Sequence, residues 1–462
     1  MAFVLGVGAF MAENQNHKFK AIDFFCGDAK VCTPQQSEKV IDQFCDFDDV
    51  EISPDWAFED FRSIEQWTHG YHRYPAKFLP NVVKKIIEEH SPDKCSVIAD
   101  LFAGCGTTLV EAKAHGINSI GTDINPVARL ITKVKTTPIN PIELQQAYHD
   151  LLFCFDKYNP ADYSNIQKHE RLDYWFRPDE KAKIAFLFDK IASLNSKEII
   201  KDFFIVCTSH ILKNCSRWLQ SSTKPQVDPH KQIPDPFNEF KCHCKKMMES
   251  NALFYNDLNE KNLLNTPCDI LLEDARNTTI DSHSIDMIIT SPPYVTSYEY
   301  ADIHQLTAYW MEYVSDMSEF RKQFIGTSFS GNTSLEVRGS LQAQRIVDDL
   351  VKKSRHVARD VAQYFNDMQK VAEEMARILV PNGHACIVIG NTKIKDVTIK
   401  SAEIFCELLQ NAGLSKEEII KRSIPHKLMP TLRDRKTGRF TKLDSPNCEK
   451  VYPNEYVIIM RK

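Results

Sequence analysis

DLFAGCGTT, residues Asp100 to Thr108, stands where an apolar run gives way to a helical pattern. The run before it, SVIADLF, predicts a buried strand, and the segment after it, TTLVEAKAHG, predicts a helix closed by Gly116. Gly104 and Gly106 would let the backbone of the intervening turn approach a ligand closely. The turn therefore predicts the first strand-to-helix corner of an α/β sheet.

A second predicted strand, NSIGTD, ends at Asp123, about twenty residues beyond the glycine turn. An acidic side chain at such a strand end can accept hydrogen bonds from the ribose hydroxyls of a nucleoside cofactor. On these residues alone, an ordinary tight turn followed by a chance acidic residue remains the alternative.

Five further apolar runs predict strands: CDILLEDA, SIDMIITSPPY, HACIVIGN, EEIIKRS and EYVIIM. A long helix around residues 371–379 precedes HACIVIGN. With the first two, these strands make seven, in an order typical of a mostly parallel, Rossmann-like sheet. The alternation stops between about Thr132 and Pro267, where KAKIAFLFDKIASL and KEIIKDFFIVCTSHIL have apolar residues at helical spacing. We therefore expect an α/β fold with a helical insertion.

Ser291-Pro-Pro-Tyr294 directly follows the apolar run IDMIIT. Two successive prolines cannot continue a strand ladder or enter a helix interior, so this segment predicts a rigid turn at the carboxyl end of a strand. Open α/β sheets bind their ligands at such strand ends. The turn presents a hydroxyl, carbonyl acceptors and an aromatic face together.

Taken together, FAGCGTT, GTDINP, EDARN and SPPY resemble the amino-methylating DNA methyltransferases, and SPPY is similar to their cytosine-N4 subgroup. The resemblance covers residues 67–135 and 265–462. It implies a class I methyltransferase fold, S-adenosylmethionine as cofactor and double-stranded DNA as substrate, with a restriction endonuclease as a further partner. Many SPPY enzymes carry this turn ahead of the glycine turn, whereas here the order is reversed. The location of target recognition is therefore not inherited from the resemblance.

The resemblance also implies the catalytic turn, Ser291, Pro292, Pro293 and Tyr294. A base flipped out of the duplex would stack on Tyr294. The Ser291 hydroxyl and the Pro292 carbonyl would accept from the target amino group and turn its lone pair toward the methyl group. The implied cofactor-binding residues are Phe78, Asp100, Phe102, Gly104, Gly106, Asp123, Asp274 and Ala275.

Within that cofactor set, the residues of the glycine turn would contact the methionine moiety. Asp123 would hold the ribose and Asp274 the adenine amino group. Phe78, in HRYPAKF, would pack near the methionine end, although a plain hydrophobic staple explains that segment equally well.

We expect three parts in the chain. Residues 1–66 form an N-terminal irregular region, and irregular packing is expected over the first ninety residues as a whole. Residues 67–135 and 265–462 form the methyltransferase catalytic domain. The helical insertion, 136–264, is a candidate for target recognition by its size.

The composition, with 43% hydrophobic and 26% charged residues among 462, is that of a soluble globular protein. No run approaches the roughly 18 apolar residues of a membrane helix, and the opening MAFVLGVGAF lacks the basic segment of an export signal. The fourteen cysteines do not follow the spacing of a secreted disulfide scaffold. These features predict a cytoplasmic enzyme with reduced thiols.

The net charge of −5 means that binding to DNA has to depend on a local positive segment. One such segment is a basic cluster in which a single acid, Asp434, is present. Its members are Lys421, Arg422, Lys427, Arg433, Arg435, Lys436, Arg439 and Lys442. The cluster predicts a phosphate-binding loop, with Arg433, Arg435, Lys436 and Arg439 as DNA contacts. A solvated surface loop is the alternative.

Other chemistries receive less support from the sequence. AIDFFCG, at residues 21–27, resembles the opening turn of cytosine-C5 methyltransferases, and Cys268 follows a proline as their nucleophile does. Cys268, however, precedes the third predicted strand. No CxxC pair of finger spacing is present, so we expect no metal. The residues considered for a metal site are Cys207, His210, Cys215, Cys242, His243 and Cys244.

The nearest rival function is methylation of adenine N6, which shares the fold and the cofactor but usually has Asp at the position of Ser291. An RNA guanine-N2 methyltransferase, a glutamine-specific protein methyltransferase and a catalytically inactive DNA-binding relative are the remaining alternatives.

Overall fold

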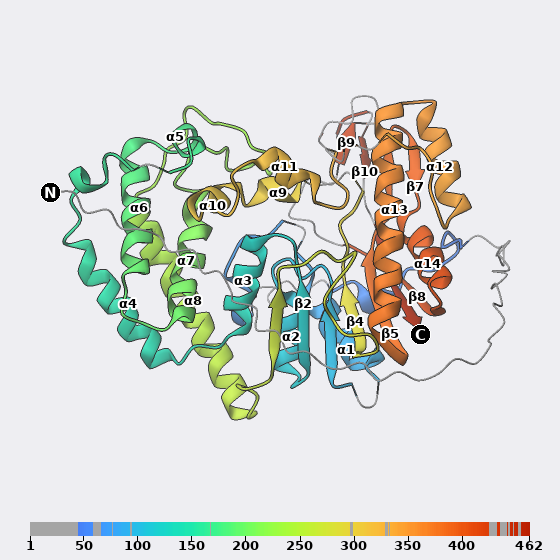
Figure 1. Ribbon diagram of the computed structural model, residues 1–462, viewed down its shortest axis with the longest axis horizontal. Coiled ribbons are helices and arrows are strands. Elements are labelled where there is room, and N and C mark those ends of the chain that lie inside the picture. Colours follow the sequence, from blue (N-terminus) through green and yellow to red (C-terminus); the bar gives the residue numbers. More distant parts are fainter. Residues whose placement is uncertain are drawn as a thin grey trace, which may run out of the picture. The chain divides into compact units, whose positions relative to one another are not determined.

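Seven apolar runs form one sheet in the computed structural model of the chain, in the order β3-β2-β1-β4-β5-β11-β8 (Figure 1). All neighbouring strands are parallel except β11, which is antiparallel to both β5 and β8. The prediction of a seven-stranded, mostly parallel α/β sheet is confirmed. The strands are β1 (Val97–Asp100), β2 (Asn118–Thr122), β3 (Cys268–Leu271), β4 (Ile285–Thr290), β5 (Leu379–Ile389), β8 (Ser415–Ser423) and β11 (Asn454–Arg461).

The structure describes residues 45–58, 66–75, 77–92, 95–166, 168–295, 299–328, 331, 333–424, 432–434, 441, 444–446, 448–450 and 454–462. The AIDFFCG segment lies outside them. Within this part of the chain, no helix combines the length and the apolar character needed to cross a membrane.

Helix α1 (Pro80–His90) packs on one face of the sheet. Its buried side chains, Val82, Val83, Ile86 and Ile87, recur at helical spacing and contact the apolar residues of β4 and β11. The expectation of irregular structure over the first ninety residues is therefore wrong for this segment. The proline at its first position and the apolar stripe were the signals that predict a helix.

Helices α2 (Thr107–Ala114) and α3 (Pro126–Thr136) follow the first two strands. The opposite face of the sheet is covered by α13 (Arg355–Ile378) and α14 (Ser401–Asn411), with α12 (Leu341–Val351) packed against α13. Helix α13 begins well before the predicted range of 371–379, because its apolar stripe continues toward its amino end.

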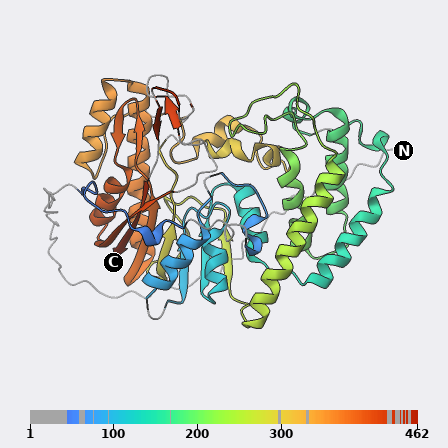
Figure 2. The ribbon, with the colours of Figure 1, turned by 180° about the vertical axis from the view of Figure 1, so that it is seen from behind.

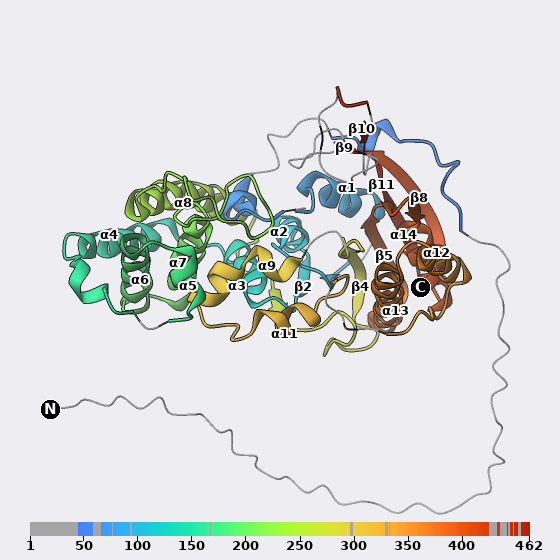
Figure 3. The same cartoon turned by 90° about the horizontal axis from the view of Figure 1, so that it is seen from above.

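The predicted insertion is helical, and its helices share one hydrophobic core with α3. They lie together beside α3, on the side of the sheet where β3 is the edge strand (Figures 1 and 3). The short helix α10 (Gln305–Trp310), which follows the SPPY turn, also contributes to this core through Leu306, Tyr309 and Trp310. The helices of the insertion are α4 (Pro141–Phe155), α5 (Arg171–Trp175), α6 (Pro178–Ala192), α7 (Glu198–Leu212) and α8 (Pro236–Glu260).

Among the described residues, two antiparallel strand pairs lie outside the main sheet (Figure 2), and the sequence pattern did not indicate either. One pairs β6 (Thr392–Ile394) with β7 (Val397–Ile399). The other pairs β9 (Leu432–Asp434) with β10 (Cys448–Lys450) and includes part of the predicted basic cluster. Each strand has three residues, too few for a period-two pattern to stand out.

Candidate active site

The glycine turn between β1 and α2 is held in place by α3. Gly104 and Gly106 have φ angles of 51° and 77°, in the left-handed region that favours glycine. A Cβ atom on Gly106 would lie 2.7 Å from Cγ2 of Thr132. The Thr132 hydroxyl donates to the Gly104 carbonyl at 3.0 Å, and Lys135 Nζ donates to the Cys105 carbonyl at 2.5 Å. The backbone of the turn is therefore fixed from the side of α3.

Asp100 links the end of β1 to the end of β4. Its buried carboxyl group accepts from the Thr290 hydroxyl at 2.6 Å and from the Phe102 amide at 3.0 Å. Burial raises the pKa of Asp100 to about 6, although these hydrogen bonds oppose the rise. The strand that precedes the glycine turn and the strand that precedes the SPPY turn are therefore joined by a side-chain hydrogen bond at their carboxyl ends.

Asp123, at the end of β2, faces the same turn. Its carboxyl group accepts from the Gly104 amide at 2.9 Å and from the Asn125 amide at 2.8 Å. Burial raises the pKa of Asp123 to about 7, and the neighbouring Asp100 adds to the rise. Two carboxyl groups whose pKa values lie near neutrality therefore share one edge of the sheet.

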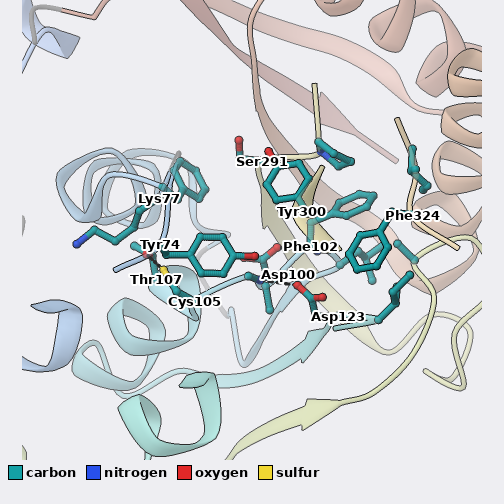
Figure 4. A pocket seen from close by; sticks show the side chains of 18 of the residues that line it. Tyr74, Lys77, Asp100, Phe102, Cys105, Thr107, Asp123, Ser291, Tyr300 and Phe324 are labelled. Atoms are coloured by element: carbon teal, nitrogen blue, oxygen red, sulfur yellow. Dashed lines mark hydrogen bonds between the residues drawn. The ribbon is translucent and has the colours of Figure 1, made fainter. Parts of the chain in front are cut away.

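A pocket of about 860 Å³, its mouth included, opens at the carboxyl ends of β1, β2 and β4 (Figure 4). Gly106 does not line it, and its part is to shape the turn. Of the cofactor residues implied by the resemblance, those that line the pocket are Phe78, Asp100, Phe102, Gly104, Asp123, Asp274 and Ala275.

Several pocket residues were not identified from the sequence. Tyr74 stands two positions after His72 in HRYPAKF and could have been found from that segment. Tyr300 and Phe324 belong to the stretch after the SPPY turn, where no motif indicates them (Figure 4). The remaining additions are Lys77, Leu101, Ala103, Cys105, Thr107, Ile124, Gln323 and Ile325.

The SPPY turn brings Ser291 and Pro293 to this pocket. The Ser291 hydroxyl donates to the Val388 carbonyl of β5 at 2.9 Å. Because its single hydrogen is used there, the oxygen can offer lone pairs to a further donor. The Pro293 carbonyl accepts from the Tyr364 hydroxyl of α13 at 3.0 Å. Strand β5 therefore holds the turn at Ser291, and helix α13 holds it at Pro293.

Pro292 and Tyr294 do not line the pocket. Pro292 is buried, and the Tyr294 hydroxyl donates to Oε2 of Glu455 on β11 at 3.3 Å. The Tyr294 ring lies against Gly390, where a Cβ atom would come within 3.1 Å of Cε2. Burial, and then Glu455, raise the pKa of Tyr294 well above its usual value. The Ser291 hydroxyl is therefore held by Val388 of β5, and the Tyr294 ring lies beside Gly390 with its hydroxyl on Glu455.

Asp274 lines the pocket but is also ion-paired. Both of its carboxyl oxygens accept from the Arg276 guanidinium, at distances between 2.5 and 3.1 Å. Arg276 also reaches Asp367 at 3.1 Å and the carbonyl of the pocket residue Gln323 at 3.0 Å. The sequence did not indicate this network, which fixes the direction of the Asp274 carboxylate.

The predicted basic cluster is wrong for Arg422. This side chain is fully buried on β8 and forms an ion pair with Glu455, so it cannot contact a phosphate. Lys421, beside it, donates to the Asp48 carbonyl at 3.3 Å. Arg433 lies on β9, but its side chain is outside the described part of the chain. So are the residues Arg435, Lys436 and Arg439.

Cys268 is not placed for attack on a base. It is the first residue of β3 and pairs in register with Ser119. Cys268 therefore lies at the amino end of a parallel strand, whereas the pocket is formed at the carboxyl ends. Among the cysteines and histidines considered for a metal, His210 and His243 stack with ring centroids 3.6 Å apart. In the part of the chain that the structure describes, no group of these thiols and imidazoles converges on a common point.

Comparison with known proteins identifies related sequences. Residues 10–134 and 285–461 match the model of a DNA methylase family, N6_N4_Mtase. The chain is 28% identical over 398 residues to the type II methyltransferase M.MvaI of Kocuria varians, covering 80% of this chain and 87% of that protein.

Two further relatives are also type II methyltransferases. M.MjaII of Methanocaldococcus jannaschii is 22% identical over 398 residues, which cover 66% of this chain and 73% of the relative. M.BsoBI of Geobacillus stearothermophilus is 26% identical over 269 residues, or 52% of each chain. The family match takes in most of the chain, with the glycine turn, Asp123 and the SPPY turn all inside it. The chain therefore belongs to the N6/N4 DNA methylase family, whose methyl donor is S-adenosylmethionine.

Proposed function

We propose that this protein is a type II DNA methyltransferase that methylates the exocyclic N4 amino group of cytosine in double-stranded DNA, within a restriction-modification system. One observation carries the proposal: Ser291 of the SPPY turn lines the same pocket as Asp100 and Asp123. The relatives named above are type II methyltransferases, which supports the class. The choice of cytosine depends on the resemblance of SPPY to the cytosine-N4 subgroup.

The pocket suits S-adenosylmethionine chemically. That cofactor joins a cationic methionine end to a ribose and an adenine, and when bound it supplies a methyl group activated by a sulfonium. Asp100 and Asp123 offer carboxyl groups to the cationic end and the ribose, and Phe78 and Phe102 offer apolar surface. Asp274, held by Arg276, is assigned to the adenine amino group. Gly104 leaves the backbone of the turn open to the methionine end.

The SPPY turn would act on the amino group of the flipped base. The lone pair of that amine is delocalised into the ring, so acceptors that draw its N–H groups favour the reactive geometry. The Ser291 oxygen fits this part, since its own hydrogen is already donated to Val388. The Pro292 carbonyl is the second acceptor in the proposal, and Tyr294 would stack on the base, whose extrusion costs a few kcal/mol.

Target recognition is assigned to the helical insertion, residues 136–264. Its size supports the assignment, and so does the core that it shares with α10, because α10 follows the SPPY turn closely in the chain. A recognition element packed against α10 could couple binding of the correct DNA site to the position of the catalytic turn. A restriction endonuclease acting on the same site and a cytoplasmic location complete the proposal.

Expression of the protein in a host without DNA modification should produce N4-methylcytosine. Ser291 offers a neutral acceptor, and the subgroup with serine here is mostly associated with cytosine. Nucleoside mass spectrometry of digested host DNA measures the product directly. DNA from cells that express Tyr294→Ala at equal level provides the matched control. N6-methyladenine as the product would contradict the base assignment alone, whereas 5-methylcytosine would contradict the mechanism, because a ring-carbon product needs a nucleophilic thiolate.

Neutralising Arg433, Arg435 and Arg439 together should weaken DNA binding and flatten its salt dependence. Each phosphate contact contributes about 0.9 to the slope of log K against log[salt], so three lost contacts should lower it by roughly two to three. Fluorescence anisotropy with duplex DNA over a salt series gives the slope. As a control, Lys84→Gln/Lys416→Gln removes exposed charges from α1 and the start of β8. An unchanged slope in the triple variant would make this segment a solvated surface loop.

A further inference from the structure

A buried ion pair lies next to Tyr294 of the SPPY turn. Arg422 on β8 and Glu455 on β11 are register partners in the antiparallel ladder, and their side chains are bonded through Nη1 and Oε1. Arg422 is 0% exposed, and its Nε donates to the Trp56 carbonyl at 2.8 Å. Its guanidinium also lies 5.7 Å from the ring centre of Phe58. The arginine is thus fixed by groups on several sides.

Glu455 connects this arginine to the catalytic turn. One carboxyl oxygen is bonded to Arg422, and the other accepts from the Tyr294 hydroxyl at 3.3 Å. The Glu455 side chain is only 15% exposed, so little water competes for these oxygens. Gly390 also lies close to the Tyr294 ring, where a Cβ atom would come within 3.1 Å of Cε2 and 3.3 Å of the hydroxyl oxygen. The ring therefore has a backbone neighbour at Gly390 and an acceptor at its hydroxyl end.

We propose that Glu455, held by Arg422, is a positioning residue for Tyr294 that keeps the aromatic ring in the orientation needed to stack on the flipped base. This inference rests on the proposed role of Tyr294 in stacking. A ring that turned freely would have to be ordered in every catalytic cycle, and misplacement of a reacting group by about 1 Å can cost 10²-fold in rate. A charged acceptor anchored by a buried arginine removes that freedom before DNA binds.

Neither residue of the pair would touch the substrate. A buried arginine in this protein is also unexpected on grounds of stability alone, because a buried ion pair is often no better for folding than apolar residues of similar volume. Within the described residues, Nη2 of Arg422 has no hydrogen-bond partner, which adds to that cost. A positioning role explains why the pair occupies this place beside the turn.

Tyr294→Phe tests the inference without disturbing the ion pair. The variant keeps the ring and removes only the hydroxyl that Glu455 holds. We expect kcat for tritiated methyl transfer to unmethylated plasmid DNA to fall about tenfold, the loss of one hydrogen bond to a charged group. The KM for DNA and the affinity for S-adenosylmethionine should stay within about twofold. Tyr456→Phe is the matched control, because Tyr456 follows Glu455 on β11 and points to the opposite face, toward Phe47.

A second variant, Arg422→Met/Glu455→Leu, replaces the pair by apolar residues and avoids an unpaired buried charge. It should lose the same factor of about ten in kcat, and adding Tyr294→Phe to it should cause no further loss, since both changes remove one interaction. Thermal unfolding of each variant shows how much of the protein is folded. A wild-type kcat in Tyr294→Phe, or losses that multiply when the changes are combined, would overturn the inference.

Tyr294→Ala separates this inference from the proposed function. An active Tyr294→Ala enzyme would remove the stacking role and the positioning role together. An inactive Tyr294→Ala enzyme with a fully active Tyr294→Phe enzyme would remove only the positioning role of Glu455.

Discussion

Replacement of Tyr294 by alanine should lower the rate of methyl transfer to DNA roughly 100-fold. Stacking on an aromatic side chain is worth about 1–3 kcal/mol per base, and the upper end of that range corresponds to such a factor. Without the ring, the flipped base has no aromatic surface on the turn, so the amino group spends less time in line with the methyl group. Initial rates of tritiated methyl transfer to plasmid DNA measure the effect.

S-adenosylmethionine binding should survive this change. Tyr294 does not line the cofactor pocket, and its hydroxyl points to Glu455 on β11. Calorimetry should therefore give an affinity within about twofold of the wild-type value. If affinity and rate fell together, the ring would be a support of the cofactor pocket and not a partner of the base.

Removal of the Asp123 carboxylate should weaken S-adenosylmethionine binding by about 1.5–3 kcal/mol, the usual worth of a hydrogen bond to a charged group. The Asp123→Ala enzyme is compared with the wild type by calorimetry. Because Asp123 also accepts from the amides of Gly104 and Asn125, thermal unfolding has to show that the variant is folded. Asp123→Asn, which keeps the shape of the side chain, is the conservative control. Unchanged affinity in a folded Asp123→Ala enzyme would contradict the ribose-binding role.

The same carboxyl group predicts how cofactor affinity depends on pH. Burial raises the pKa of Asp123 to about 7 in the free protein. A protonated carboxyl has lost the negative charge that accepts most strongly from ribose hydroxyls, so affinity should fall as the pH falls through 7. Linkage gives a loss of about tenfold between pH 8 and pH 6 if binding requires the carboxylate. Asp123→Asn should lose no more than about twofold over this interval, the part left to Asp100, whose pKa is about 6. A profile as steep as the wild type would assign the proton to another group.

Much of the site could be predicted from the sequence because its decisive features are local. A buried strand, two glycines and a helix need only neighbouring residues to form the turn at Gly104 and Gly106. Parallel strands end at the same edge of a sheet, so Asp100, Asp123 and Ser291 could be expected together before any contact was known. The pocket contains all three.

Helix boundaries depended more on context. The segment of α1 follows a stretch without clear periodicity, and the amino end of α13 extends well beyond the range that its strongest apolar run marked. Both helices are stabilised mainly by apolar stripes packed on the sheet. A stripe in the sequence gives the direction of packing but not where packing stops.

The sequence by itself determined the α/β order of the elements, the glycine turn and the rigid SPPY turn, since these follow from residues close together in the chain. Only the tertiary structure decided that Arg422 is buried, because its partner Glu455 is 33 positions away and a count of charges treats every arginine as exposed. It also decided that the Ser291 hydroxyl donates to Val388 on β5 and the Tyr294 hydroxyl to Glu455 on β11. The direction of a side chain depends on which strands flank the turn. Glu455 of β11, which accepts from Tyr294, lies 161 positions further along the chain, so the sequence near the turn does not indicate this contact.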